Sequence, residues 1–294
     1  MKLLFLFLLL ILLGYQSAVD LGYTVEIIGY SEMNAPIHAV YNASTSHLPT
    51  VLILLNIHGD EAAGYHMGVR MLEHPLGDLG VNAVWVPTMN PDGLAYNLRE
   101  NMEGIDLNRA FGDHCNRTES PSAAESDVME KFIQELRPLA IVSYHMGAAV
   151  VVWGPDQNCN STEAAVKAPM SSFEEQLDTY WASRYAHHWG KGDESRTIQG
   201  SAMYQLSGSL LEYAVPKYSQ LGLVVEMDRH KHPNDVLEEI VESQHRVALL
   251  AFLADIGKEA VSVLPECLKA ESLFVDGNPN AKWFLTHGMS SLCK

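Results

Sequence analysis

The sequence is poor in basic residues. Of its 294 residues, 19 are Lys or Arg and 36 are Asp or Glu, which gives a formal net charge of −17 at pH 7. A surface with this balance repels nucleic acid and attracts cationic partners, so we expect no nucleic-acid-binding function. The chain also has no internal repeat, no low-complexity run and no stretch typical of an interdomain linker.

Cysteine is scarce as well. The spacing of the four cysteines fits no zinc knuckle, so we do not interpret them as metal ligands. In an oxidising compartment, an even number of cysteines predicts two disulfides with three possible pairings, and no free thiol in the mature protein. The residues concerned are Cys115, Cys159, Cys267 and Cys293.

Long apolar runs are missing after the first residues. Residues 3–13 form an unbroken apolar run behind a positively charged start, and small residues follow as far as Ala18. The run is shorter than the ~20 residues that span a bilayer, so residues 1–18 are predicted to be a secretory signal peptide, with an uncleaved anchor as the alternative. Three glycosylation sequons agree with secretion. We therefore expect a secreted glycoprotein without a membrane anchor. The sequons begin at Asn42, Asn116 and Asn160.

Apolar runs alternate with helical patterns along the rest of the chain. Continuous apolar runs predict strands buried on both faces at residues 51–57, 81–87, 139–144 and 221–227. Helical patterns occupy residues 60–72, 123–136, 173–189 and 235–256. This alternation predicts an α/β fold, an α/β/α sandwich around a mixed, mostly parallel central sheet. We expect one catalytic domain over residues 19–256 and a C-terminal tail over residues 257–294.

Polar side chains suited to metal binding follow three of the predicted strands. His58 and Glu61 come directly after the first strand, His145 ends the third, and Glu226 interrupts the apolar run of the fourth. Two histidines and one glutamate, with a position left for water, form a recurrent catalytic zinc set. Each residue also has an ordinary interpretation: a His-x-x-Glu spacing arises by chance, His145 could be a core histidine, and Glu226 could cap a helix or pair with Arg229.

Six motifs in a fixed order favour the catalytic interpretation. They extend over roughly residues 25–255 and resemble the zinc metallocarboxypeptidase family, which includes pancreatic A and B types and regulatory N/E types. The chain is more similar to the N/E type, although the part after the last predicted helix is too short for the transthyretin-like domain of that branch. The motifs are HGDE, NPDG, DLNR, the segment around His145, GSAMYQLSG and VVEM.

The resemblance implies a role for each residue of the catalytic centre. His58, Glu61 and His145 would bind one zinc ion per chain. Glu226 would be the general base, and Arg99 would polarise the scissile carbonyl. These roles agree with the chemistry, because attack on an amide needs an activated water, a proton carrier and a cation for the oxyanion.

The same resemblance implies how a peptide C-terminus would be recognised. Asn108 and Arg109 would hold the terminal carboxylate, and Tyr204 would close over it. Arg suits this role because its planar guanidinium forms two parallel hydrogen bonds with a carboxylate. Asp156 lies where the regulatory branch selects a C-terminal Lys or Arg, although it could also be an ordinary loop aspartate in a turn. Leu211, at the side-chain pocket, favours hydrophobic residues instead.

The sequence therefore predicts a secreted zinc metallocarboxypeptidase that hydrolyses the C-terminal peptide bond, with a preference for C-terminal Lys or Arg. The same chemistry on hydrophobic C-termini is one alternative. A zinc deacylase of the aspartoacylase type is a second, because it shares a similar His-x-x-Glu and DLNR. A secreted binding protein without turnover is a third. The natural substrate and the oligomeric state do not follow from the sequence.

Overall fold

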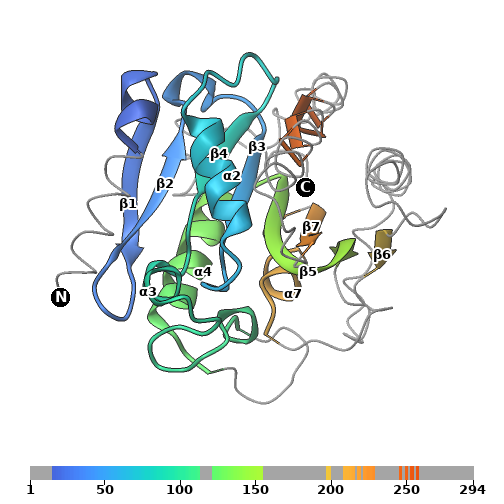
Figure 1. Cartoon of the computed structure of the whole chain (residues 1–294). Helices are drawn as coiled ribbons and strands as arrows, with labels where there is room; N and C mark the ends of the chain where they lie inside the picture. The colour runs from blue at the N-terminus through green and yellow to red at the C-terminus, as the bar shows by residue number, and fades with distance from the viewer. Residues whose placement is uncertain are drawn as a thin grey trace, which may run out of the picture.

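The computed structural model describes residues 15–112, 121–154, 197–199, 208–215, 217–219 and 221–228, together with parts of 245–257. Its centre is a seven-stranded sheet in the order β1-β2-β4-β3-β5-β6, with β7 paired to β5. The strands are β1 (Thr24–Tyr30), β2 (Pro36–Tyr41), β3 (Thr50–Leu55), β4 (Asn82–Val86), β5 (Ala140–Gly154), β6 (Thr197–Gln199) and β7 (Leu221–Asp228). Figure 1 shows the sheet with β1 at one side and β6 at the other.

Helices connect and cover these strands. The α-helices are α2 (Ala63–Leu72), α3 (Pro91–Tyr96), α4 (Ala124–Leu136) and α7 (Leu210–Ala214). Two 3-10 turns, η1 (Ala43–Thr45) and η2 (Leu107–Arg109), lie between them, and further helical residues occur over 15–20 and in parts of 245–257. β1 and β2 pair antiparallel, as do β2 and β4, whereas β3 is parallel to both β4 and β5. The mixed, mostly parallel sheet predicted from the sequence is confirmed.

The core forms two layers, one on each face of the sheet. Along β3, Val51, Ile53 and Leu55 belong to one apolar cluster and Leu52 and Leu54 to the other, as the alternation of a strand requires. The first cluster also contains α2 residues and the second contains α4 and α7 residues. In Figure 1, α2 lies in front of the sheet and α4 behind it. This is the predicted α/β/α sandwich.

β5 is much longer than the predicted strand over 139–144, and it borders β7 on both sides. Its first part pairs in parallel with β7, from Ala140 opposite Leu221 to Gly147 opposite Asp228. Beyond a register shift the partner numbers fall, from Val150 opposite Glu226 onward, so the second part runs back along β7. The second part also pairs with β6. β7 therefore lies inside the sheet with a partner on each edge.

The Asn-Pro-Asp-Gly motif is composed of residues that favour turns, yet it begins a helix. Asn90 is the N-cap of α3, and its side-chain oxygen accepts a hydrogen bond from the Gly93 N–H. Pro91 occupies the first helical turn, where a missing N–H costs nothing. Because asparagine, proline and aspartate favour both turns and helix starts, the short motif did not distinguish the two.

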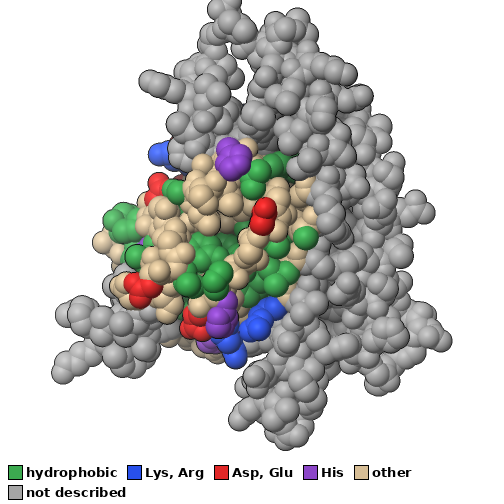
Figure 2. Space-filling view, turned by 90° about the horizontal axis from the view of Figure 1, so that it is seen from above, with side chains coloured by type: hydrophobic (Ala, Val, Ile, Leu, Met, Phe, Trp, Pro, Cys, Tyr) green, Lys and Arg blue, Asp and Glu red, His purple; other side chains and the backbone are tan. Residues whose placement is uncertain are grey.

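Several sequence predictions fall outside the described residues. These are most of the signal peptide, all four cysteines, the sequons at 116 and 160, the helix over 173–189, most of the helix over 235–256 and the tail. Within the part of the chain that the structure describes, no helix is long and apolar enough to cross a membrane. Viewed from above, one group of acidic, basic and histidine side chains lies at an edge of the described surface, and others are scattered over it among hydrophobic side chains and backbone (Figure 2).

Candidate metal centre

The site lies where β3, the first part of β5 and β7 end. β3 stops at Leu55, and the following loop carries His58 and Glu61 before α2 begins. His145 lies on β5 directly opposite Glu226 of β7. Because the two strands pair in parallel there, residues in register project on the same face. The fold thus brings together four side chains from three segments that are far apart in the sequence, at the strand ends where α/β sheets form their sites.

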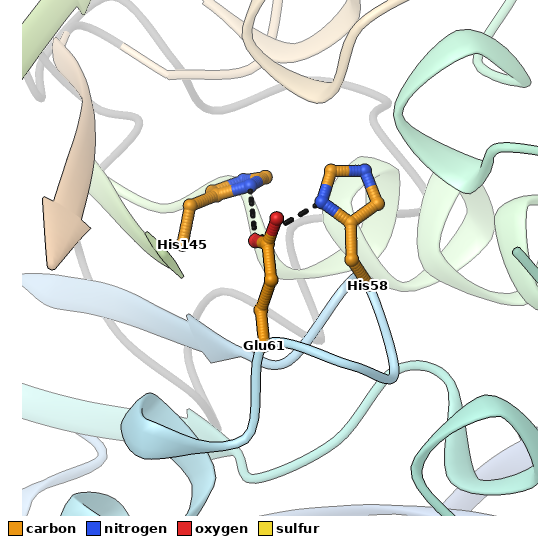
Figure 3. A group of neighbouring side chains, drawn as sticks. All are labelled: His58, Glu61 and His145. Carbon is orange, nitrogen blue, oxygen red and sulfur yellow. Dashed lines mark ion pairs between the residues drawn. The ribbon is translucent and has the colours of Figure 1, made fainter. Parts of the chain in front are cut away.

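Three of these side chains converge closely enough to hold one ion. Glu61 Oε2 lies 3.1 Å from His58 Nδ1 and 3.2 Å from His145 Nδ1. Figure 3 shows the carboxylate between the two rings, with His58 and Glu61 on one loop and His145 on the neighbouring strand. All three residues are buried, and a ligand atom from each lies within 4.8 Å of the others. Two imidazoles and a carboxylate fit a catalytic zinc site.

The hydrogen bond of Asp106 identifies the metal-binding nitrogen of His58. Asp106 Oδ1 lies 3.0 Å from His58 Nε2, so Nε2 carries the proton and Nδ1 is left as an electron-pair donor. Nδ1 is buried and has no hydrogen-bond partner, although Glu61 is near. An orphaned nitrogen that faces a carboxylate and a second imidazole is what a metal ion would satisfy.

Arg99 joins the same cluster from the other side. Its two terminal nitrogens contact Glu61 Oε1 at 3.0 Å and Asp106 Oδ2 at 3.1 Å. Burial alone would raise the pKa of Glu61, but the adjacent His145 and His58 rings outweigh it and hold the pKa well below its usual range. Burial opposes ionisation of Asp106 too, but His58 and Arg99 hold the pKa of this carboxyl below its usual range. Both carboxylates are therefore charged at neutral pH, as binding to a cation requires.

Glu226 lies beside the three ligands without joining their contacts. Burial raises the pKa of its carboxyl, as expected for a group that exchanges a proton. A Cβ added at Gly147 would lie 2.5 Å from Glu226 Oε2, so the carboxylate occupies space that only glycine leaves open. Glu226 is thus a half-buried carboxylate in register with His145.

Of the residues predicted to bind the substrate, Asn108, Arg109 and Leu211 are described. Asn108 Oδ1 accepts a hydrogen bond from Leu210 N at 3.0 Å, which fixes the amide so that its NH₂ group is free to donate elsewhere. Arg109 donates to its neighbour's carbonyl oxygen at 2.7 Å and remains half-buried. Leu211 is buried in the core over β7 and is 7% exposed. The other two residues of this group, Tyr204 and Asp156, lie outside the described residues.

Comparison with known proteins identifies the family to which this chain belongs. The family model described as zinc carboxypeptidase matches residues 21–246, which is most of the chain. The chain belongs to the zinc carboxypeptidase family. Zinc is the cofactor of this family, and the His58, Glu61 and His145 cluster is the candidate for its site.

The relatives of this zinc carboxypeptidase chain are distant. It is 27% identical over 221 residues to carboxypeptidase D of Drosophila melanogaster, covering 63% of this chain and 16% of that protein. It is 23% identical over 228 residues to carboxypeptidase SOL1 of Arabidopsis thaliana, covering 72% of this chain and 46% of that protein. The chain therefore spans less than half the length of these relatives.

Solved structures confirm the fold. Carboxypeptidase A from Helicoverpa armigera matches with a TM-score of 0.66 and 17% identity, covering 84% of this chain and 71% of that chain. Thrombin-activatable fibrinolysis inhibitor matches with a TM-score of 0.62 and 18% identity, covering 84% and 72%. At these identities the likeness concerns the fold alone.

Two residues of the site were not predicted. Asp106 was part of the quoted DLNR motif, yet it received no role, although a ligating histidine usually donates its second N–H to a carboxylate. That rule would have pointed to Asp106. Gly147 follows His145 by two positions, and nothing in the sequence reveals that a carboxylate from β7 needs the space. A packing contact of this kind appears only once the strands are paired.

Proposed function

We propose that this protein hydrolyses the C-terminal peptide bond of peptides or proteins with a bound zinc ion. The observation that carries the proposal is the convergence of His58, Glu61 and His145, buried at the strand ends, with Glu226 on the neighbouring strand. These are three ligands of catalytic type and a separate carboxylate for proton transfer. Membership of the zinc carboxypeptidase family supports this reaction class.

In the proposed reaction, His58, Glu61 and His145 hold the zinc ion. When bound, zinc supplies Lewis acidity to the scissile carbonyl and to the attacking water. Glu226 takes a proton from that water and returns it to the nitrogen of the leaving amino acid, so that one water is consumed and two chain ends form. The raised pKa of Glu226 suits a group that must both accept and release a proton.

Arg99 stabilises the oxyanion that develops on the carbonyl oxygen. Its guanidinium is oriented by Glu61 and Asp106, and it remains 36% exposed towards solvent. Arginine carries five N–H donors, and these two contacts leave others for the substrate. A donor that is already oriented needs no rearrangement during the reaction, which is why such groups contribute strongly to catalysis.

Asn108 and Arg109 bind the terminal carboxylate of the substrate. The bond from Leu210 to Asn108 Oδ1 turns the amide NH₂ into the donor available for a carboxylate. Tyr204 closes over the bound end, and Asp156 selects a C-terminal Lys or Arg. The net charge of −17 favours cationic substrates in the same direction. The protein acts after secretion, with residues 1–18 as its leader and residues 19–256 as its catalytic domain.

The test is mass spectrometry of matched peptides that differ only in their last residue, Arg, Lys, Phe, Leu or Asp. Each peptide is incubated with the protein, with a chelator, and with chelator followed by excess zinc. The expected result is zinc-dependent removal of Arg or Lys alone, abolished in Glu226→Gln. Removal of Phe or Leu instead would assign specificity to the pocket at Leu211. Turnover of N-acyl amino acids without any peptide cleavage would reject the proposal in favour of a deacylase.

A further inference from the structure

Three buried polar side chains lie behind the metal centre and connect to one another. Asn56 and Asn90 are 0% exposed and Thr88 is 3% exposed. The Thr88 hydroxyl donates to Asn56 Oδ1 at 2.8 Å and accepts from the backbone N–H of Asn90 at 3.1 Å. Asn56 follows β3, and Thr88 and Asn90 follow β4. We call these three residues the asparagine relay.

The Asn56 end of the relay holds the loop of metal ligands. Its amide NH₂ donates to the carbonyl of His58 at 2.7 Å and reaches that of Gly59 at 3.4 Å. The Asn56 backbone has φ 55°, a left-handed conformation that asparagine tolerates better than most residues. This conformation turns the chain from β3 into the loop, so Asn56 both creates the bend and bonds the backbone of the first ligand.

The Asn90 end holds the loop that carries Arg99. The NH₂ group of Asn90 lies 3.2 Å from the carbonyl oxygen of Glu100 and 3.5 Å from that of Arg99. It also reaches the carbonyl oxygen of Ile57, in the ligand loop, at 3.4 Å. Its oxygen meanwhile caps α3 through the Gly93 N–H at 2.9 Å. One buried side chain thus contacts both loops and fixes the start of a helix.

The two loops also contact each other directly through backbone atoms. Gly59 N donates to the carbonyl of Arg99 at 3.3 Å. A Cβ added at Gly59 would also lie 2.0 Å from the backbone carbon of Gly93, in the helix α3 that precedes the Arg99 loop. Because backbone meets backbone in both contacts, the ligand loop has little room to move relative to α3 and the Arg99 loop. The relay therefore fixes two loops that are already packed together.

We propose that the asparagine relay is a positioning device that sets His58 relative to Arg99. Asn56 acts through the metal-ligand loop, and Asn90 acts through Arg99. None of the three side chains contacts the metal centre, so the relay works only through the backbones it bonds. The claim on Arg99 rests on the proposed peptidase function, whereas the claim on His58 concerns metal binding alone.

Two substitutions separate the ends of the relay. Asn56→Gly keeps the left-handed backbone, which glycine adopts readily, and removes the two bonds to the ligand loop. We expect its zinc affinity, measured by chelator competition, to fall about tenfold, within the range known for groups that orient metal ligands. Asn90→Ser keeps a helix-capping oxygen and removes the NH₂ donors. We expect kcat on the best peptide to fall about tenfold or more, with zinc affinity within about twofold of wild type.

A double-mutant comparison tests whether Asn90 acts through Arg99. In an Arg99→Ala background, adding Asn90→Ser should reduce kcat by less than about threefold, because residues that act as a unit are not additive. The matched control is Asn82→Ser. Asn82 is also buried and bonds Thr50 at 3.1 Å, but at the opposite ends of β3 and β4. The Asn82→Ser substitution should lower the melting temperature of the protein and leave kcat and zinc affinity unchanged.

Two results would overturn the proposal. An equal loss of kcat from Asn90→Ser in both backgrounds would make the relay a general support of the fold. A wild-type zinc affinity and an unchanged cobalt absorption spectrum in Asn56→Gly would deny any effect on His58. The cobalt spectrum and zinc affinity need no peptide turnover. If the wild-type protein binds zinc but cleaves no peptide, the proposed function fails and the claim on His58 is still decided.

Discussion

Replacing Gly147 by alanine should slow catalysis without weakening zinc binding. The new Cβ would lie 2.5 Å from Glu226 Oε2 and 3.4 Å from its Cδ. Carbon and oxygen atoms in ordinary contact lie about 3.5 Å apart, so the carboxylate must retreat by about 1 Å. Because the clashing atom is at the end of a flexible side chain, we expect the fold to stay intact. The Glu226 carboxylate moves instead, and catalysis slows because the base is displaced.

A displacement of about 1 Å in a catalytic group costs on the order of a hundredfold in rate. We therefore expect kcat for the best C-terminal peptide to fall about a hundredfold in Gly147→Ala, with KM and zinc affinity within about twofold of wild type. Gly112→Ala is the matched control, since the nearest neighbour of its new Cβ would be Glu130 Oε1 at 3.4 Å. Its kinetic constants should equal those of the wild type.

Shortening the base should partly relieve the clash. Glu226→Asp draws the carboxylate back by one methylene, so the two changes together should cost less than the product of their separate losses. A wild-type kcat in Gly147→Ala would refute the steric argument. Loss of zinc together with kcat would refute it equally, because the change would then act on His145 rather than on the base.

Three further predictions concern other parts of the molecule. Asp106→Asn should weaken zinc affinity ten- to a hundredfold, measured by chelator competition, because the His58 ring loses its charged partner at 3.0 Å; unchanged affinity would show that this contact does not orient the ligand. Asn108→Asp keeps the oxygen that accepts from Leu210 N at 3.0 Å but places a negative charge where the substrate carboxylate binds. Charge repulsion should therefore raise KM at least about tenfold, with a smaller effect on kcat. An unchanged KM in steady-state assays would contradict this role. Burial lowers the pKa of His245 to about 3 from 6.5, so the unfolded state takes up a proton first, and stability should fall from pH 6.5 towards pH 3 by up to about 1.4 kcal/mol per pH unit. Urea unfolding across that range should show a shallower decline in His245→Phe, and an equal decline would place the acid sensitivity elsewhere.

The sequence predicted the centre of the fold well because buried parallel strands are continuous apolar runs. β3, β4 and β7 lie within two residues of their predicted bounds. β1 and β2 were not predicted, since β1 lies at the sheet edge and alternates neither in burial nor in hydrophobicity. β5 was predicted only in its first part. Its return along β7 depends on pairing between distant segments, which no local pattern reveals.

The site was predictable to the extent that it depends on residue type and order. His58, Glu61 and His145 follow predicted strands and Glu226 lies at the end of one, and parallel strands bring such residues to one edge of a sheet. The relay was not predictable in the same way. Asn56 lies within an apolar run of the sequence, so nothing marks it as functional. Its role follows only from the hydrogen bonds of its side chain to the carbonyl oxygens of His58 and Gly59 in the folded structure.

Because β7 lies between the two parts of β5, local unfolding around the metal ligand His145 is coupled to local unfolding around the base Glu226. Backbone amides with partners on both edges of a sheet open only when a large unit of the protein unfolds, so they exchange hydrogen for deuterium slowly. His145 and Glu226 occupy opposite positions in that unit. Local unfolding that frees the backbone at one of them must therefore also open the strand of the other. Zinc binding and peptidase activity should accordingly be lost together, in a single step, during gentle denaturation.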